Sequence, residues 1–289
     1  MSNEETSMEI EATPSIELSS CSDSTAGDMK EFEMTKKGLK ILFLFSDTGG
    51  GHRASALSLS KQFEILFPGS EYYLYDPFSE KECAPPYNNF AKTYQHLSNH
   101  PLQWKLVYHT GNLRAIELCF STHLRFYLEE MIRNAIKRYN PDVVISVHPM
   151  LTNVPLLSCR KISEETGRYI PMYTVVTDLG GGHSLWFCNG VDKLYVPSDQ
   201  IMALAKMRGK VPDEKLVKIG LPIRHDFSVQ NKALGGDRTS ENGKAYQKGI
   251  RSDLKLPFTY RRVILYMGGE GRYRILIRDC GCLVCRMYA

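Results

Sequence analysis

The residues LKILFLFSDTGGGHRASALSLSKQFEILF, at positions 39–67, set the expectation for the whole fold. They begin with a nearly continuous apolar run of strand length, typical of a parallel strand buried on both faces. The glycine-rich turn DTGGGH follows at residues 47–52, and residues 53–67 resemble a helix in composition. A strand, a glycine turn and a helix in this order open a βαβ unit, so we expect an α/β protein.

The following residues repeat this alternation. Further strand-length runs stand at residues 71–78, 142–149, 172–179, 193–198 and 215–222, with helical stretches within 87–139 and at 151–166 and 198–208. Alternation of this kind predicts a Rossmann-like α/β fold, a doubly wound parallel sheet with right-handed crossovers. In such a sheet the functional loops lie at the carboxyl ends of the strands.

Composition divides the chain into four parts. Residues 1–37 carry nine acidic and three basic side chains without apolar periodicity, which predicts a disordered acidic tail. Residues 38–227 contain the expected sheet, and the polar residues 228–258 are predicted to be a linker or an insertion. At residues 259–289 a strand and a glycine-rich turn begin again, as in the truncated start of a second α/β domain.

Charge and hydropathy limit the classes of partner. Beyond the acidic tail the chain carries 33 basic and 23 acidic side chains, a balance that suits nucleic acid, nucleotide phosphates or an anionic membrane. No window approaches the roughly 20 apolar residues of a spanning helix, so we expect any membrane contact to be peripheral. The cysteines are scattered except for Cys280, Cys282 and Cys285, and without a second ligand pair they predict no metal site.

The turn after the first strand is a candidate anion-binding loop. Its residues include Asp47, Gly49, Gly50 and Gly51. The glycines permit a tight turn and close approach of a ligand, and the N–H groups of the following helix point into the loop. It is not a Walker A loop, because the required Gly-Lys-Ser/Thr ending is absent.

His52 is the candidate general base. It stands in the first turn of the predicted helix, where the helix dipole disfavours an imidazolium and keeps the ring neutral. A neutral imidazole accepts a proton from a hydroxyl group. The alternative is a histidine that only caps the helix.

Other polar candidates follow later strands. His148 ends one predicted strand, and Asp178 and His183 follow another. In a parallel sheet these side chains share one edge with His52, where Asp178 can orient a histidine or accept a proton. The alternatives are loop residues that cap the next helices and, less favoured, a metal site built from the histidines and the aspartate.

Large apolar side chains are also expected in loops. Trp186 and Phe187 follow a run of glycines, and Pro86 precedes a predicted helix. Exposed apolar groups on a basic surface suit contact with a lipid interface, whereas the alternative is that each is a buried anchor.

Several motifs together resemble one enzyme family. They are SDTGGGHRASA, LQWKLVYHTG, PDVVISVHPML, VVTDL followed by WF, YVPS, and GLPIRHDF. Their order and spacing over residues 39–227 are similar to those of monogalactosyldiacylglycerol synthases and the related bacterial diacylglycerol glucosyltransferases. The resemblance implies the N-terminal half of a GT-B glycosyltransferase, with 38–227 as the acceptor-binding domain and a second domain for the UDP-sugar.

The implied reaction is an inverting transfer of galactose from UDP-galactose to the hydroxyl of 1,2-diacylglycerol. By this resemblance His52 is the base and Asp178 a supporting carboxylate. The glycine turn makes room for the acceptor and donor phosphates, while Pro86, Trp186 and His148 are expected to contact lipid. The family implies diacylglycerol and anionic membrane lipids as partners, with no nucleic acid, no cofactor and no catalytic metal.

The resemblance weakens near the carboxyl end. MGGEG supplies Gly268, Gly269 and Glu270 as expected donor-binding residues, with one glycine fewer than the family pattern. The alternative function is therefore a non-catalytic lipid- or membrane-binding half-enzyme. The family implies the plastid envelope, but the acidic N-terminal residues do not resemble a transit peptide, which leaves the cytosolic face of a membrane as the alternative.

Overall fold

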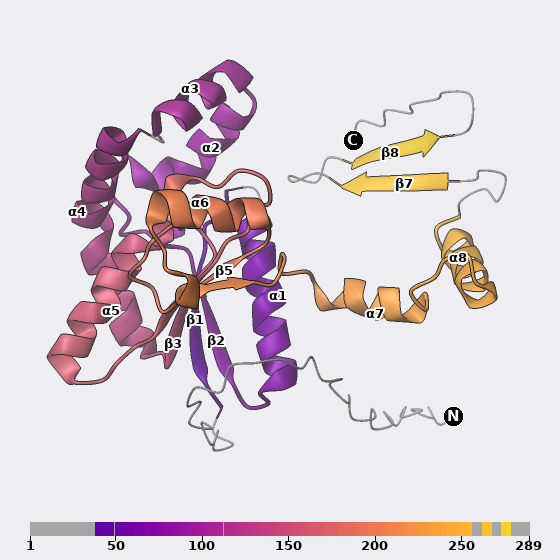
Figure 1. The fold of residues 1–289 in the computed structure, drawn as a ribbon, viewed down its shortest axis with the longest axis horizontal. Coiled ribbons are helices and arrows are strands. Elements are labelled where there is room, and N and C mark those ends of the chain that lie inside the picture. Colours follow the sequence, from indigo (N-terminus) through magenta and orange to yellow (C-terminus); the bar gives the residue numbers. More distant parts are fainter. Residues whose placement is uncertain (1–37, 49, 112, 256–261, 268–272, 279–289) are drawn as a thin grey trace, which may run out of the picture. The chain divides into compact units, whose positions relative to one another are not determined.

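The computed structural model describes residues 38–48, 50–111 and 113–255, and the backbone of the strands at 262–267 and 273–278 (Figure 1). The predicted acidic tail at residues 1–37 lies outside these residues, as do Cys280, Cys282 and Cys285.

A six-stranded parallel sheet with the order β2-β1-β3-β4-β5-β6 organises the fold. Its strands are β1 (Lys40–Leu44), β2 (Glu71–Tyr75), β3 (Val143–Ser146), β4 (Met172–Val175), β5 (Lys193–Val196) and β6 (Leu216–Lys218). Leu44 is in register with Tyr75 on one side and with Ser146 on the other. The strand order reverses between β1 and β3, the point where ligands bind in open sheets of this kind. The predicted doubly wound α/β fold is confirmed.

Apolar side chains of β1 alternate between the two faces of the sheet. Ile41 and Phe43 belong to the smaller core beneath α1 (Gly51–Leu66). Leu42 and Leu44 belong to the larger core, which includes side chains of the helices on the opposite face. These helices are α4 (Arg114–Tyr139), α5 (Asn153–Thr166) and α6 (Asp199–Gly209), with α4 and α5 beside each other (Figure 1). Burial on both faces explains the continuous apolar run in the sequence.

Local sequence signals mark the ends of α4 and α5 and the start of α6. α4 is capped at its carboxyl end by Asn140, whose φ of 45° is left-handed and which precedes Pro141. α5 ends at Gly167 with a φ of 70°, and the Ser198 side chain accepts from the Ile201 N–H at the start of α6. Shorter elements are α2 (Phe90–Ser98), α3 (Pro101–Gly111) and the 3₁₀ helices η1 (Pro77–Ser79), η2 (Tyr87–Asn89), η3 (Pro149–Leu151), η4 (Ser184–Trp186) and η5 (Asp213–Lys215).

The segment predicted as a linker or insertion is largely helical. α7 (His225–Ala233) continues into its first residues and α8 (Glu241–Asp253) lies within it. Ser240 starts α8 by accepting a hydrogen bond from the Gly243 N–H at 3.0 Å, a local capping signal within a polar sequence. Its role as a linker stays a prediction.

β7 (Arg262–Met267) and β8 (Tyr273–Arg278) form a separate antiparallel pair, with Val263 opposite Ile277. The sequence predicted the first of these strands as the start of a second domain, and that assignment stays a prediction. In the part of the chain that the structure describes, no helix has the length and apolar character needed to cross a membrane.

Candidate active site

The loops after β1, β3 and β4 bring the expected polar residues together at the carboxyl edge of the sheet. We call His52, His148, Asp178 and Trp186 the rim cluster. The His52 and His148 rings have centroids 4.6 Å apart in an edge-on arrangement, and the Trp186 ring centre lies 6.1 Å from that of His52. Residues distant in sequence thus meet because β1, β3 and β4 are neighbours in the sheet.

One nitrogen of His52 is held by the backbone. Its Nδ1 lies 2.7 Å from the Val147 carbonyl oxygen, and because a carbonyl only accepts, Nδ1 must carry hydrogen and donate it. The Thr177 hydroxyl oxygen lies 3.0 Å from the same nitrogen. In the neutral ring, Nε2 therefore keeps a lone pair and can accept a proton.

The environment of His52 keeps the ring neutral. Burial lowers the pKa of His52 below its ordinary value, while the charge of Asp178 and the bond to the Val147 carbonyl oppose this lowering. The sequence predicted a neutral ring because of the helix dipole. The structure has the same direction of shift, but burial is its main cause.

His148 is buried beside His52 and is not exposed on a loop. It is only 4% exposed, and its Nδ1 accepts from the Met150 N–H at 3.3 Å, which places the hydrogen of the neutral ring on Nε2. Burial, followed by the neighbouring His52 and His183, lowers its pKa well below the usual value. The expected position at the edge of the sheet is correct, but in this structure His148 offers little surface for lipid.

Trp186 and Asp178 form a fixed pair. The indole Nε1 donates to Asp178 Oδ2 at 2.7 Å, and the Trp186 side chain is 0% exposed. The expectation of an exposed, lipid-contacting Trp186 is therefore corrected, because the indole packs in the larger core. Asp178 is half-buried, and its position beside the histidines was expected.

The glycine turn has a backbone conformation that favours glycine, as the sequence predicted. Gly50 adopts a φ of 78°, a left-handed conformation, and α1 begins at Gly51. Gly50 and Gly51 are exposed, and a Cβ on either would meet no atom within 4 Å, so open space lies beside the turn. Gly49 lies outside the described residues.

Two acidic side chains order the start of this turn. The Asp47 carboxylate pairs with Arg53 at 3.1 Å, and the Asp47 N–H donates to Asp76 Oδ2 at 3.0 Å. Asp76 also accepts from the Phe78 N–H. Asp47 therefore shapes the loop and is already paired with a cation, whereas the sequence analysis did not identify Asp76 because its role depends on the neighbouring strand.

The remaining candidate residues, Pro86, His183 and the three expected donor-binding residues, are not members of the rim cluster. Pro86 is exposed and leads into η2, after which the Phe90 ring lies 6.0 Å from that of His148. His183 is half-buried, and its Nδ1 accepts from the Leu185 N–H. Gly268, Gly269 and Glu270 lie outside the described residues. Among the residues described, no three or more His, Cys, Asp or Glu side chains gather to hold a metal ion.

Helices α2 and α3 provide an aromatic wall near the rim cluster. Burial raises the pKa of the Tyr94 phenol, and the charge of Asp178 raises it further, so this α2 side chain is near the cluster. The Tyr94 and Trp104 rings meet edge-on with centroids 5.3 Å apart. A Cβ on Gly181 would lie 3.3 Å from the Tyr108 hydroxyl of α3. The sequence motif LQWKLVYHTG therefore contributes to this wall.

Comparison with known proteins places the chain in a family. The family model for "Monogalactosyldiacylglycerol (MGDG) synthase" matches residues 52–223. A probable monogalactosyldiacylglycerol synthase 2, chloroplastic, from Oryza sativa subsp. indica is 34% identical over 238 residues, which is 82% of this chain and 47% of the relative. Monogalactosyldiacylglycerol synthase 2, chloroplastic, from Arabidopsis thaliana is 31% identical over 233 residues, 80% of this chain and 46% of the relative.

Among solved structures, the apo form of the lipopolysaccharide outer core galactosyltransferase WaaB aligns with a TM-score of 0.39 and 14% identity, covering 64% of this chain and 46% of that one. The chain spans about half the length of the curated relatives it matches. Because the family model covers more than half of the chain, the protein belongs to the monogalactosyldiacylglycerol synthase family.

Proposed function

We propose that this chain is the acceptor-binding half of a GT-B enzyme that transfers galactose from UDP-galactose to 1,2-diacylglycerol with inversion. The observation that carries the proposal is the state of His52. Its Nδ1 is held by the Val147 carbonyl, its pKa is lowered by burial, and it follows a glycine turn beside open space. This is the state that a general base requires to act on a hydroxyl group.

In the proposed reaction His52 Nε2 takes the proton of the diacylglycerol hydroxyl. The resulting oxygen attacks the anomeric carbon of galactose, and the bond to UDP breaks with its electron pair leaving on the phosphate. Attack from the face opposite UDP inverts the anomeric centre. Asp178 stabilises the imidazolium that forms, since its charge already raises the pKa of His52. No cofactor or metal takes part.

The surface of α3 supports a lipid acceptor at a peripheral membrane site. Leu102 is 85% exposed, and Leu106 and Val107 are also exposed on this helix. Apolar side chains presented by a helix beside basic groups such as Lys105 suit insertion at the headgroup level of a bilayer. The names of the relatives include "chloroplastic", and we propose the plastid envelope, with the cytosolic face of another membrane as the alternative.

We assign binding of the donor, UDP-galactose, to a second domain. The chain spans about half of its relatives, and the proposed UDP-galactose contacts Gly268, Gly269 and Glu270 stand at its carboxyl end. If the chain acts alone, the second candidate function is lipid binding without transfer. The exposed apolar residues of α3 favour this candidate, because they need no donor.

The test is incubation of the purified protein with diacylglycerol in anionic vesicles and radiolabelled UDP-galactose. We expect labelled galactolipid, and we expect His52→Ala to lower its formation by about 10²- to 10⁴-fold, the usual contribution of a general base. His225→Ala is the matched control, because His225 is half-buried in α7 and bonds to Gln62.

Unchanged product formation by His52→Ala would contradict the assignment of the base. Absence of product from the unmodified protein, with retained binding to the vesicles, would favour the lipid-binding candidate over the transferase.

A further inference from the structure

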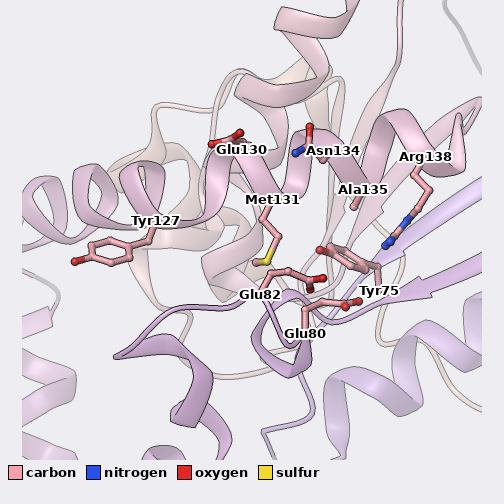
Figure 2. Close-up of a pocket in the computed structure, with 9 residues that line it drawn as sticks. All are labelled: Tyr75, Glu80, Glu82, Tyr127, Glu130, Met131, Asn134, Ala135 and Arg138. Carbon is pink, nitrogen blue, oxygen red and sulfur yellow. The ribbon is translucent and has the colours of Figure 1, made fainter.

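A cavity of about 420 Å³ lies between α4 and the segment that follows η1 (Figure 2). It shares no lining residue with the rim cluster. The residues that α4 contributes are mostly spaced by three or four positions, so one face of the helix forms one wall. The other wall consists of Tyr75 at the end of β2 and of Glu80 and Glu82. We call this the acidic cavity, and its complete lining is Tyr75, Glu80, Glu82, Tyr127, Glu130, Met131, Asn134, Ala135 and Arg138.

The three carboxylates of the acidic cavity are not neutralised. Within the described part of the chain, Glu80, Glu82 and Glu130 form no ion pair, and their carboxylates accept no hydrogen bond. Glu129 and Glu165, by contrast, each pair with lysine at the nearby contact of α4 with α5. Uncompensated negative charges that share one cavity favour a cationic ligand.

One arginine also lines the acidic cavity, but it pairs with none of these carboxylates. Arg138 forms no ion pair with a described residue, and its guanidinium carbon lies 5.0 Å from the centre of the Tyr139 ring. It is exposed and stands in the last turn of α4. Three negative charges against one positive charge leave the cavity with a net negative charge.

A buried hydroxyl group points into the acidic cavity. Tyr75 is only 2% exposed, and its phenol oxygen makes no hydrogen bond to a described residue. Figure 2 shows this hydroxyl directed between Met131 and the Glu82 carboxylate. Burial raises the pKa of the Tyr75 phenol, and the charge of Glu80 raises it further, so the hydroxyl stays protonated. Its lone pairs are available to accept a hydrogen bond from a ligand in the cavity.

The distribution of the carboxylates defines the kind of cation. Among the described residues, no three His, Cys, Asp or Glu side chains gather closely enough to hold one metal ion. The negative charge is therefore spread along the cavity. Tyr127 and Met131 stand beside Glu130 on α4 and offer an aromatic ring and a thioether to methylene groups and to a cation. An elongated cation with several ammonium groups joined by methylene chains matches both features.

We propose that the acidic cavity binds an aliphatic polyamine. Its ammonium groups pair with the three carboxylates, and one of them donates an N–H to the Tyr75 hydroxyl. The methylene chain lies along Tyr127 and Met131. A volume of about 420 Å³ is within the range of small-molecule sites. This site is separate from the rim cluster and does not depend on the proposed transfer reaction.

The experiment is isothermal titration calorimetry of the full 289-residue chain with spermidine. We expect Tyr75→Phe to weaken binding about tenfold, because a hydrogen bond from a charged donor is lost at a buried position. Tyr72→Phe is the matched control, since it removes the same hydroxyl group from β2 at a residue that does not line the cavity. Circular dichroism establishes that each variant is folded.

Further variants test the charge of the cavity in both directions. Glu82→Gln and Glu130→Gln should each weaken the binding of spermidine about fivefold, as expected for the loss of one ion pair. Arg138→Gln should strengthen it by a similar factor, because it removes a cation that repels the ligand. Glu164→Gln is the charge control and should leave binding unchanged, since Glu164 is an exposed residue of α5 outside the lining.

Magnesium chloride separates a polyamine site from a metal site. At equal ionic strength Mg²⁺ should compete only poorly with spermidine, and putrescine should bind more weakly because it has fewer ammonium groups. Full competition by Mg²⁺ would overturn the proposal, because a divalent ion would then be the ligand. An equal loss in Glu164→Gln would overturn it by showing attraction through overall charge alone, and so would the absence of measurable spermidine binding.

Discussion

The rim cluster and the acidic cavity place ionisable groups in opposite environments. In the rim cluster His52 and His148 are held by backbone groups, and burial lowers the pKa of each. In the acidic cavity Glu80, Glu82 and Glu130 have no ion-pair partner among the described residues. The first arrangement prepares a neutral proton acceptor, whereas the second maintains a negative charge for a ligand.

This difference separates chemistry from ligand binding at a second site. Changes in the rim cluster should alter turnover without altering spermidine binding, and changes around the acidic cavity should do the reverse. A variant that changed both by similar factors would show that the two regions form one site.

After His52→Ala, the largest effect is expected from Asp178→Asn. The amide oxygen can still accept from the Trp186 Nε1–H, but the charge that raises the pKa of His52 is lost. We expect turnover to fall about tenfold or more, equivalent to about 1.4 kcal/mol at the transition state, because the imidazolium is less stabilised. The measurement is kcat for galactolipid formation beside the affinity for spermidine. Unaltered kcat would remove Asp178 from the mechanism.

The framework of α4, which carries one wall of the acidic cavity, should respond to Glu129→Gln. Glu129 of α4 pairs with Lys161 of α5 at 3.1 Å, and its contact with Arg133 at 3.2 Å lacks hydrogen-bond geometry and is electrostatic. We expect a loss of about 1–2 kcal/mol in the free energy of unfolding, because Gln at this largely buried position removes the charge that is ion-paired with Lys161 and Arg133. Urea unfolding measures it.

The control for this change is Glu241→Gln, at an exposed pair with Lys244 in α8. It should alter the free energy of unfolding by less than about 0.5 kcal/mol. Equal losses in the two variants would mean that the α4–α5 ion pairs have no special role.

The pH dependence of transfer should follow His52. Because burial lowers its pKa, the neutral base persists at pH values below its ordinary pKa of about 6.5, and activity is lost only as the pH falls through the lowered value. Half-maximal activity on the acid side should therefore occur below about pH 6.5. A kcat profile measures this, and Asp178→Asn should move the acid limb to still lower pH. Half-maximal activity above pH 7 would contradict a buried neutral base.

The smallest effect is expected from Asn134→Ala. Asn134 lines the acidic cavity, but its amide carries no charge. We expect about twofold weaker binding of spermidine, a few tenths of a kcal/mol, and unchanged kcat. Glu130→Gln is the comparison, since it removes a charge from the same face of α4. An equal or larger loss in Asn134→Ala would mean that hydrogen bonding, and not charge, selects the ligand.

Much of the fold could be predicted because its signals are local. The apolar run at Ile41–Leu44 alternates between two cores, so it had to be a strand buried on both faces. The left-handed Gly50, the Asn140–Pro141 end of α4 and the Ser198 cap are likewise readable from residue type. The α8 helix was missed because its sequence is polar and its start depends on the single cap at Ser240.

The candidate site was only partly predictable. Gathering of His52, His148 and Asp178 followed from the rule that parallel strands end at one edge. The Val147 carbonyl and Thr177 hydroxyl could not be identified, because a backbone acceptor has no sequence signature and Thr177 acts across the fold. Burial of Trp186 was left open as the alternative to lipid contact, because a tryptophan after glycines is compatible with an exposed position and with a core anchor.

The sequence by itself determined the order of strands and helices, the glycine turn and the family, because periodicity, turn chemistry and ordered motifs are carried by neighbouring residues. Only the tertiary structure decided which nitrogen of His52 is free, that Asp178 binds Trp186, and that the Tyr75 hydroxyl shares a cavity with three carboxylates. The physical reason is that proton positions, burial and local fields depend on groups that the chain brings together from distant positions.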